Sequence, residues 1–313
     1  MVYDLAIIGG GPAGAAAGVY AARKRLKTVF ITKDFAGQST VSQDVQNWIG
    51  TVSISGEELS KNLEKHLRAY ADDVLHIETN HWVKTIQKKD DHFEVVTDKV
   101  GTGHSFEAKT VLITTGSYRR KLEVPGAAEF ENKGITYCAS CDAPLFGGMD
   151  VVVVGGGNAA FESAAQLFQY AKSVTLLHRR AEFKADEITV QKVLANPKMK
   201  AITNVDITEI KGEKFVKSIV FKHRDTGEVT ELPTQGIFVE IGLLPNTDFV
   251  KNLVKIDQFN HVVVDPRTQR TSVEGVWAAG DCTDGLYHQN NIAAGDAVKA
   301  LEDIYNFLHV KKN

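Results

Sequence analysis

Two cysteines separated by two residues are the side chains of this sequence best suited to chemistry. Cys138 and Cys141 lie in the stretch TYCASCDAP, residues 136–144. Their spacing suits three uses: part of a metal site, a structural disulfide, or a disulfide that opens and closes during a reaction. The residues around the pair must therefore decide which use applies.

The cysteine content argues against the first two uses. Three cysteines in 313 residues do not make a disulfide framework, so we expect a reducing cytoplasm, where a structural disulfide is disfavoured. A zinc site normally takes four ligands, yet the sequence has no second C-x-x-C and Cys282 stands alone. We therefore expect no metal.

The composition limits the possible partners. A net charge of -3, with 43% hydrophobic and 24% charged residues, leaves no basic excess for binding nucleic acid or an anionic membrane. The first residues, MVYDLAIIGGGPAGA, lack the basic region of a signal peptide, and no run of about 18 apolar residues predicts a transmembrane helix. We expect a cytoplasmic protein with neither a nucleic-acid nor a membrane partner.

One pattern occurs twice, in residues 4–34 and 150–180. Each stretch has an apolar strand, a glycine cluster, an alanine-rich helical pattern and a second apolar strand, which is the order of a dinucleotide-binding unit. Three small residues allow a tight turn, close approach of a pyrophosphate, and packing of the helix on the strand. These are Gly9, Gly11 and Gly14 in the first unit, and Gly155, Gly157 and Ala160 in the second.

The two units differ where their second strands end. The second unit ends in LLHRR, which places Arg179 and Arg180 where a Rossmann fold meets the adenosine ribose. Arginine at this place favours a 2′-phosphate, and Lys184, one helical turn on, adds charge. The second unit is therefore predicted to bind NADPH. The first unit has Thr32 and Lys33 at this place, so we expect a different dinucleotide there.

A third segment supports a flavin site. Residues 275–285, GVWAAGDCTDG, predict a short strand that ends at Gly280 and Asp281, and an aspartate there suits a ribityl hydroxyl of FAD. Residues 287–308 predict a helix whose N-terminus faces a flavin ring.

The predicted fold is α/β, with two interleaved Rossmann-like dinucleotide-binding domains. The expected FAD domain covers residues 1–116 and 245–313. The expected NADPH domain, residues 117–244, is inserted between these parts and carries the cysteine pair. Apolar strands broken by glycine, in residues 111–120 and 236–247, flank the second unit, and the two connections are expected near Gly116 and near residues 242–246.

With these motifs in this order, the sequence resembles the low-molecular-weight thioredoxin reductases of bacteria and archaea. It is also similar to the flavin half of the alkyl hydroperoxide reductase flavoprotein. The likeness covers essentially the whole chain and rests on GGGPAG, AGQ…QNWIG, TTG, CASCD, GGGNAA, HRR, IGLLPNT and AGD…HQ. It implies FAD and NADPH as cofactors, a homodimer, and a thioredoxin-like partner protein.

The resemblance also implies the residues of each site. The redox pair is Cys138 and Cys141, with Asp142 as its acid. The residues implied for FAD are Gly9, Gly11, Pro12, Ala13, Gly14, Gln38, Asn47, Gly280, Asp281, His288 and Gln289. The residues implied for NADPH are Gly155, Gly157, Asn158, Ala160, His178, Arg179, Arg180 and Lys184.

Some positions depart from the thioredoxin reductase pattern. His288 stands where those reductases usually have arginine, Lys184 replaces an expected arginine, and CDAP replaces the commoner CDGP. CDAPLF, FKADE and GDCT resemble the alkyl hydroperoxide reductase flavoprotein, whose N-terminal thiol-relay module is not expected here because the FAD motif begins at residue 5.

The interpretation favoured is an NADPH-dependent thioredoxin-disulfide reductase. Electrons are expected to pass from NADPH to FAD, then to Cys138–Cys141, and then to a redoxin through a mixed disulfide. The alternatives are a reductase in a peroxiredoxin relay, a flavin-dependent dithiol oxidase, and a non-enzymatic nucleotide-sensing module with idle cysteines. Cys282 is expected to be a buried apolar residue near FAD.

Overall fold

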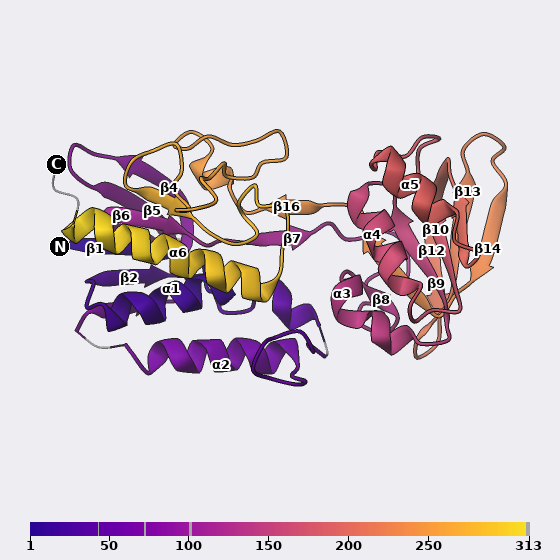
Figure 1. Ribbon diagram of the computed structural model, residues 1–313, viewed down its shortest axis with the longest axis horizontal. Helices are drawn as coiled ribbons and strands as arrows, with labels where there is room; N and C mark the ends of the chain where they lie inside the picture. The colour runs from indigo at the N-terminus through magenta and orange to yellow at the C-terminus, as the bar shows by residue number, and fades with distance from the viewer. Residues whose placement is uncertain (43, 72, 100–101, 311–313) are drawn as a thin grey trace. The chain divides into compact units, whose positions relative to one another are not determined.

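The chain forms two compact units in the computed structural model, which describes residues 1–42, 44–71, 73–99 and 102–310. Figure 1 labels many of the elements of both. Unit 1 contains Met1–Val41, Trp48–Tyr118 and Leu244–Asn313, and unit 2 contains Ser42–Asn47 and Arg119–Leu243. The division thus falls after residues 118 and 243, and it adds the short segment Ser42–Asn47 to unit 2, which sequence reasoning did not predict.

Unit 1 is built on a seven-stranded sheet with the order β3-β2-β1-β6-β5-β4, and β17 also pairs with β6. Its strands are β1 (Val2–Ile8), β2 (Thr28–Ile31), β3 (Leu75–Glu78), β4 (Trp82–Lys88), β5 (Phe93–Lys99), β6 (Thr102–Ile113) and β17 (Val276–Ala278). Its helices are α1 (Pro12–Arg23), α2 (Gly56–Arg68) and α6 (Asn290–His309), with one-turn helices η1 (Gln38–Val41) and η3 (Asp248–Val250). β1, β2, β3 and β17 run parallel within this sheet, whereas β4 and β5 form an antiparallel extension.

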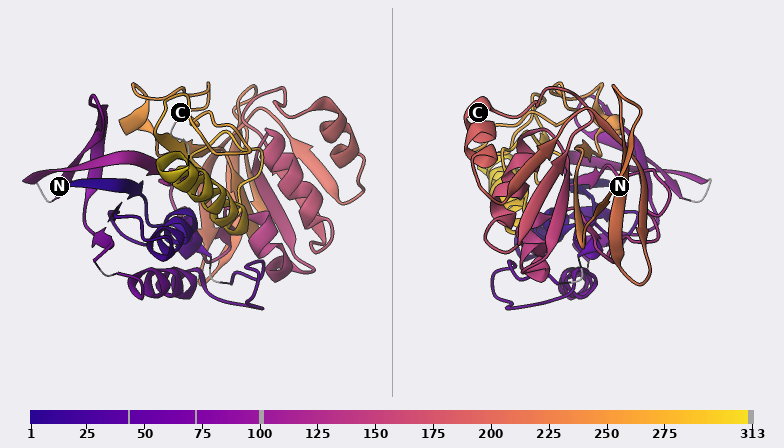
Figure 2. Two further views of the ribbon diagram at one scale, coloured as in Figure 1. Left: turned by 60° about the vertical axis from the view of Figure 1, so that its left-hand side comes forward. Right: turned by 90° about the vertical axis from the view of Figure 1, so that its right-hand side faces the viewer.

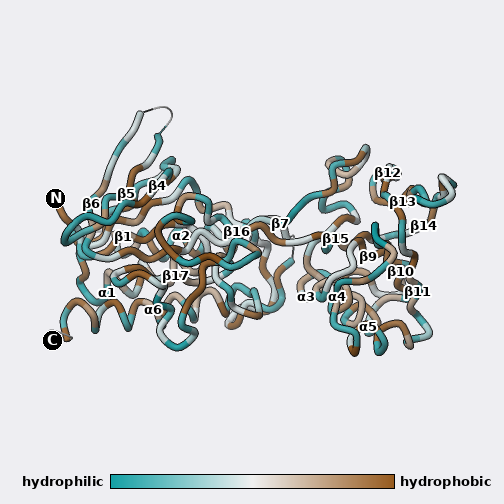
Figure 3. The backbone as a smooth tube through the Cα atoms, turned by 90° about the horizontal axis from the view of Figure 1, so that it is seen from above, coloured by the Kyte–Doolittle hydropathy of each residue, from teal (hydrophilic) through white to brown (hydrophobic). Residues whose placement is uncertain are grey.

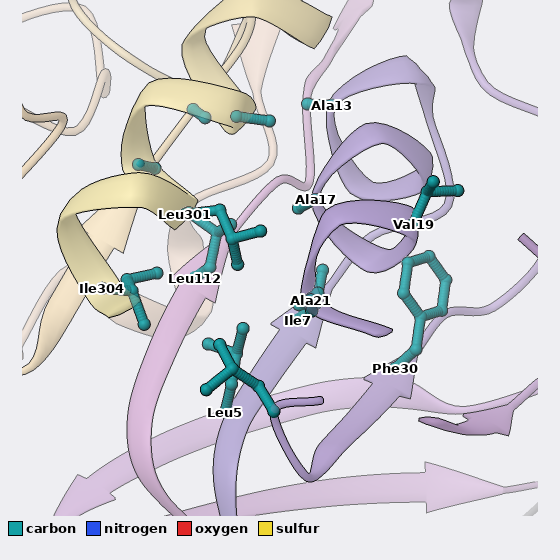
Figure 4. Packing of buried hydrophobic residues seen from close by; sticks show 14 of the residues in the cluster. Leu5, Ile7, Ala13, Ala17, Val19, Ala21, Phe30, Leu112, Leu301 and Ile304 are labelled. Atoms are coloured by element: carbon teal, nitrogen blue, oxygen red, sulfur yellow. The ribbon is translucent and has the colours of Figure 1, made fainter. Parts of the chain in front are cut away.

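Helices α1 and α6 lie side by side on the parallel part of this sheet (Figures 1 and 2). Small residues make this possible: Ala17 and Ala21 of α1 are fully buried and let the helices approach closely. Figure 4 shows Leu301 and Ile304 of α6 turned toward Leu5 and Leu112 of the sheet. This apolar layer holds the glycine turn between β1 and α1 in place.

Unit 2 contains a five-stranded parallel sheet with the order β11-β10-β9-β15-β8, and a three-stranded antiparallel sheet with the order β12-β13-β14. Its strands are β8 (Ile135–Thr136), β9 (Asp150–Gly155), β10 (Ser173–Leu177), β11 (Met199–Ile202), β12 (Val205–Gly212), β13 (Val216–His223), β14 (Val229–Pro233) and β15 (Gly236–Glu240). Its helices are α3 (Ala139–Asp142), α4 (Asn158–Leu167) and α5 (Glu187–Leu194), and η2 (Ala143–Phe146) is a single 3-10 turn.

The central strands of both sheets are apolar on both faces, as the brown stretches of β9 and β15 show in Figure 3. This is the pattern of parallel strands that helices cover on either side. The predicted α/β class with two Rossmann-like units is therefore confirmed. None of the helices in the described ranges is long and apolar enough to cross a bilayer.

The two connections predicted from the sequence, near residues 118 and 243, are short. The predicted strands 111–120 and 236–247 are each interrupted: β6 ends at Ile113 and β15 at Glu240, and β7 (Ser117–Arg119) and β16 (Leu243–Pro245) pair separately. Gly116 and Gly242 sit at the interruptions with φ of 61° and 116°. Residues that carry a Cβ rarely adopt a backbone conformation with positive φ, so glycine is the residue that permits each turn.

Leu301→Ala tests the layer between α6 and the sheet. The Leu301 side chain is fully buried, so its truncation leaves a cavity and should lower the free energy of unfolding by about 2–5 kcal/mol. Leu286→Ala is the matched control, because Leu286 is 84% exposed and its loss should change stability by about 0.5 kcal/mol or less. Urea unfolding measures both. Equal effects of the two variants would contradict this account of the core.

Candidate active site

The cysteine pair lies at a one-turn helix that follows β8. Cys138 directly precedes α3, and the backbone N–H groups of Cys141 and Asp142 donate to the Cys138 carbonyl at 3.2 and 3.0 Å. Cys138 and Cys141 form a disulfide, and both residues are partly exposed. A disulfide that solvent can reach is open to attack by a thiolate.

The third cysteine has the opposite environment. Cys282 is fully buried, and this burial raises the pKa of its thiol to about 11. A thiol that stays protonated at neutral pH is a poor nucleophile. Cys282 therefore acts as a small buried side chain, as predicted.

Asp142 lies at the end of the same helical turn and is buried. Thr136 donates its hydroxyl hydrogen to Oδ2, and Ser42 donates to Oδ1 at 3.2 Å. Burial raises the pKa of Asp142, while the two hydroxyl groups and the charge of Arg119 oppose that rise. A carboxyl group that holds its proton above the usual range suits a proton donor beside a disulfide.

Thr136 and Ser42 were not among the predicted site residues. Ser42 is 100 positions away from Asp142 in the sequence, and an isolated serine gives no signal of such a contact. Thr136 ends the apolar strand β8, where a hydroxyl is also common in a purely structural role. The contacts became visible only once the chain was folded.

Unit 1 has a cleft of about 830 Å³ at the carboxyl ends of its parallel strands. Seven of the predicted flavin-site residues line it: Gly9, Gly11, Pro12, Ala13, Gln38, Gly280 and Asp281. Gly14 lies beneath the turn, where a Cβ would overlap the Gly9 carbonyl. His288 and Gln289 precede α6 outside this lining, and Asn47 belongs to the segment assigned to unit 2.

The cleft fits a dinucleotide. Its size falls within the range of small-molecule sites. An added Cβ at Gly11 would meet no atom within 4 Å, so the backbone at the N-terminus of α1 is open to a phosphate. Sequence reasoning missed Trp82, a half-exposed residue of the lining whose ring centroid lies 5.5 Å from Lys33 Nζ.

The second glycine turn is covered by the loop that follows β10. The Lys184 backbone N–H donates to the Gly156 carbonyl at 2.8 Å, and the Asp186 N–H donates to Asn158 Oδ1 at 2.8 Å. These bonds hold the end of the loop against the glycine turn, and Arg179, Arg180 and Lys184 are exposed in the same loop. The Asn158 side chain therefore holds the loop that follows β10 through this hydrogen bond.

His178 has a packing role in this loop. The residue is buried, and a Cβ at Gly156 would collide with its ring. Burial lowers the pKa of His178, and the nearby charges of Arg180, Arg179 and Lys184 lower it too. The neutral ring fixes the distance between the strand end and the glycine turn.

The chain is similar to thioredoxin reductases of known structure. Its similarity to the enzyme from Streptococcus pyogenes has a TM-score of 0.88 and 35% identity over 99% of each chain. For the enzyme from Giardia duodenalis the TM-score is 0.91, with 34% identity over 98% of each chain.

Curated relatives carry other names. An "NADH dehydrogenase" of Bacillus subtilis is 38% identical over 98% of this chain, and an alkyl hydroperoxide reductase component of Escherichia coli is 35% identical over 98%. The chain spans 58% of the length of each of these two proteins.

A family description covers nearly the whole chain. Residues 3–297 match the family of pyridine nucleotide-disulphide oxidoreductases, for which FAD and a pyridine nucleotide are the implied cofactors. The two glycine turns and the disulfide described above fit these cofactors and this chemistry. The chain therefore belongs to the pyridine nucleotide-disulphide oxidoreductase family.

Proposed function

We propose that this protein is an NADPH-dependent flavoprotein disulfide reductase that acts on a thioredoxin-like protein. The observation that carries the proposal is the partly exposed Cys138–Cys141 disulfide with the buried Asp142 on the same helical turn. Similarity to thioredoxin reductase structures over 98–99% of their chains supports it. Bound FAD would supply the two-electron exchange between a nicotinamide and a disulfide.

The chain's own residues account for the thiol chemistry. In the dithiol form, one cysteine thiolate attacks the partner's disulfide and forms a mixed disulfide, releasing one partner sulfur as a thiolate. The second cysteine then attacks the mixed bond, restores the Cys138–Cys141 disulfide and releases the other partner sulfur. Asp142 is proposed to protonate a leaving thiolate, because it lies one helical turn from Cys138 and burial raises the pKa of its carboxyl.

The preference for NADPH is proposed from the basic loop of unit 2. Arg179, Arg180 and Lys184 are exposed beside the second glycine turn, where charge-assisted hydrogen bonds to a 2′-phosphate can form. The FAD and NADPH labels of the two units, and a homodimer in the cytoplasm, are proposals of the same kind, drawn from the resemblance.

A second candidate is a flavoprotein reductase in a peroxiredoxin relay. It is favoured by relatives named as alkyl hydroperoxide reductase components, at 35–38% identity. Those relatives are longer, and the chain spans 56–59% of them. NADPH oxidation with purified thioredoxin, with a glutaredoxin, and with a peroxiredoxin plus its thiol-relay module separates the two candidates, because only the true acceptor sustains turnover.

Cys138→Ser and Cys141→Ser should each abolish reduction of a redoxin. The remaining thiol cannot form or resolve the intramolecular disulfide, whereas reduction of the flavin by NADPH should persist, because it does not use the cysteines. Cys282→Ala is the control and should retain redoxin reduction, since Cys282 is buried and its thiol stays protonated. Anaerobic flavin bleaching and redoxin reduction are measured in parallel. Redoxin reduction at the wild-type rate in either serine variant would refute the proposed role.

Arg179→Ala and Arg180→Ala should lower kcat/KM for NADPH and leave that for NADH nearly unchanged. Each charge-assisted hydrogen bond is worth roughly 1.5–3 kcal/mol, so we expect a loss of about ten- to hundredfold per arginine. Lys214→Ala, at an exposed position away from this loop, is the control. Steady-state kinetics with both nucleotides provide the measurement. Equal kcat/KM for NADPH and NADH in the wild type would show that the arginines have no such role.

Asp142→Asn should change the pH dependence of stability. Burial raises the folded-state pKa of Asp142, so the folded protein binds this proton more tightly than the unfolded chain does. The stabilising contribution is complete below the unfolded pKa of about 3.9 and is lost as the pH rises through the raised folded pKa. Asparagine does not titrate, so the variant's stability relative to wild type should increase with pH across this window.

Urea unfolding at a series of pH values checks this expectation. Asp225→Asn, in an exposed turn, is the matched control. A stability difference for Asp142→Asn that stays constant or decreases with rising pH would contradict the direction of the pKa shift.

A further inference from the structure

A second buried carboxyl group lies in unit 2, and the proposed function leaves it unused. Glu240 is the last residue of β15, and its side chain is only 6% exposed. Oε1 accepts a hydrogen bond from the Ser163 hydroxyl at 2.7 Å, and Oε2 accepts one from Arg119 at 3.0 Å. Burial raises the pKa of Glu240, while Arg119 and Ser163 oppose this and the charge of Glu162 adds to it.

The strand register places Glu240 at the edge of the sheet from which the cysteines extend. β8 and β15 are parallel neighbours, and Thr136 pairs with Phe238. Thr136 donates to Asp142, and Cys138 follows it by two residues, just as Glu240 follows Phe238 by two. The redox pair, its acid and Glu240 therefore share one end of the sheet.

Arg119 connects the two acids. Its side chain is bonded to Glu240, and its positive charge also acts on Asp142. The adjacent backbone is fixed as well, because the Arg120 N–H donates to the Gly242 carbonyl at 3.0 Å. Besides burial, the main groups that act on the pKa of Asp142 are the hydroxyls of Thr136 and Ser42, the cation of Arg119 and the anion of Asp44.

A structural reason alone accounts poorly for this pair. Replacing a buried ion pair by apolar residues is often neutral or stabilising, so such a pair is weak evidence for a stability role. Here the pair has a specific geometric consequence, since Ser163 anchors Glu240, and Glu240 in turn holds the guanidinium of Arg119 at the end of the sheet that carries the redox pair. Arg119 also belongs to β7, one of the two connections between the units.

We propose that Arg119 is a positioning residue for the redox site: held by Glu240, which Ser163 anchors in turn, its positive charge governs proton delivery by Asp142 to the sulfurs. This inference rests on the proposed function, because it is there that Asp142 serves as the proton donor. The inference adds Arg119, which lies outside the cysteine motif. It also makes the protonation of Asp142 depend on the conformation of β7, the strand to which Arg119 belongs.

The test is a titration of Asp142 in the complete oxidised flavoprotein. The infrared C=O band of its protonated carboxyl is followed as a function of pH, and the loss of that band in Asp142→Asn identifies it. In the double variant Arg119→Gln/Glu240→Gln the cation is absent, so the midpoint should rise by about one pH unit. In Glu240→Gln alone the cation loses its counter-charge, so the midpoint should fall.

Two further variants separate charge from structure. Arg119→Lys keeps the positive charge and should keep the wild-type midpoint. Arg120→Gln removes the neighbouring exposed arginine, which is not among the main influences on Asp142, and it should leave the midpoint unchanged. If the double variant does not fold, Glu240→Gln and Arg119→Lys still give opposed expectations, a lower midpoint against an unchanged one.

The outcomes for this inference and for the proposed function can be told apart. A midpoint in the folded double variant that coincides with wild type, or a rise in Arg120→Gln as large as in the double variant, would overturn the role of Arg119. Failure of the wild-type protein to reduce any redoxin would overturn the proposed function, while the infrared titration would still report on Arg119. If both hold, the alkaline limb of the pH profile of redoxin reduction should move with the infrared midpoint in every variant.

Discussion

The strands at the centre of each unit are buried on both faces, and this restricts polar chemistry to their carboxyl ends. Ile7 in β1, Val153 in β9 and Phe238 in β15 are fully buried, so their strands have no room for a reacting group. Each strand can present polar atoms only where its hydrogen-bonded ladder stops. Nearly every residue assigned to a site follows such an end. The glycine turns follow β1 and β9, the cysteines follow β8, the arginines follow β10, and Gly280 and Asp281 follow β17.

This restriction also explains why ionisable groups in unit 2 are coupled to one another. Neighbouring strand ends lie about 5 Å apart, so the groups they carry share a small volume of low polarity. Asp142 and Glu240 both have raised pKa values because burial is the largest influence on each. The charge of Arg119 lowers the pKa of both, which is the basis for proposing that the arginine couples the two acids.

Features that depend on the order of residues within a short stretch of chain could be predicted from the sequence. A strand, a glycine turn and an alanine-rich helix follow one another within each 31-residue stretch, so both dinucleotide-binding folds could be predicted from spacing alone. The contacts that set the chemistry of Asp142 depend on long-range folding. Ser42 is 100 positions from Asp142, and Arg119 is 121 positions from Glu240. Neither pair has a local signal, because serine, arginine and glutamate are common at surface positions too. The helix predicted over residues 287–308 also begins later, at Asn290, where regular helical hydrogen bonds first form.

Because α3 is only one turn long, a partly exposed disulfide and a buried acid can occur on the same helical turn. Cys138 precedes the helix and Asp142 ends it, a spacing of four residues, and the Asp142 N–H donates to the Cys138 carbonyl. The Asp142 carboxyl points inward, where it accepts hydrogen bonds from Thr136 and Ser42. One turn is short enough that the disulfide stays partly exposed while the carboxyl is covered by β8 and the segment that carries Ser42. A longer helix would need further core contacts, and an isolated exposed acid would lose its raised pKa to water. The single turn thus joins a partly exposed disulfide to a carboxyl group held in the core, which is the arrangement that the proposed reduction of a protein disulfide requires.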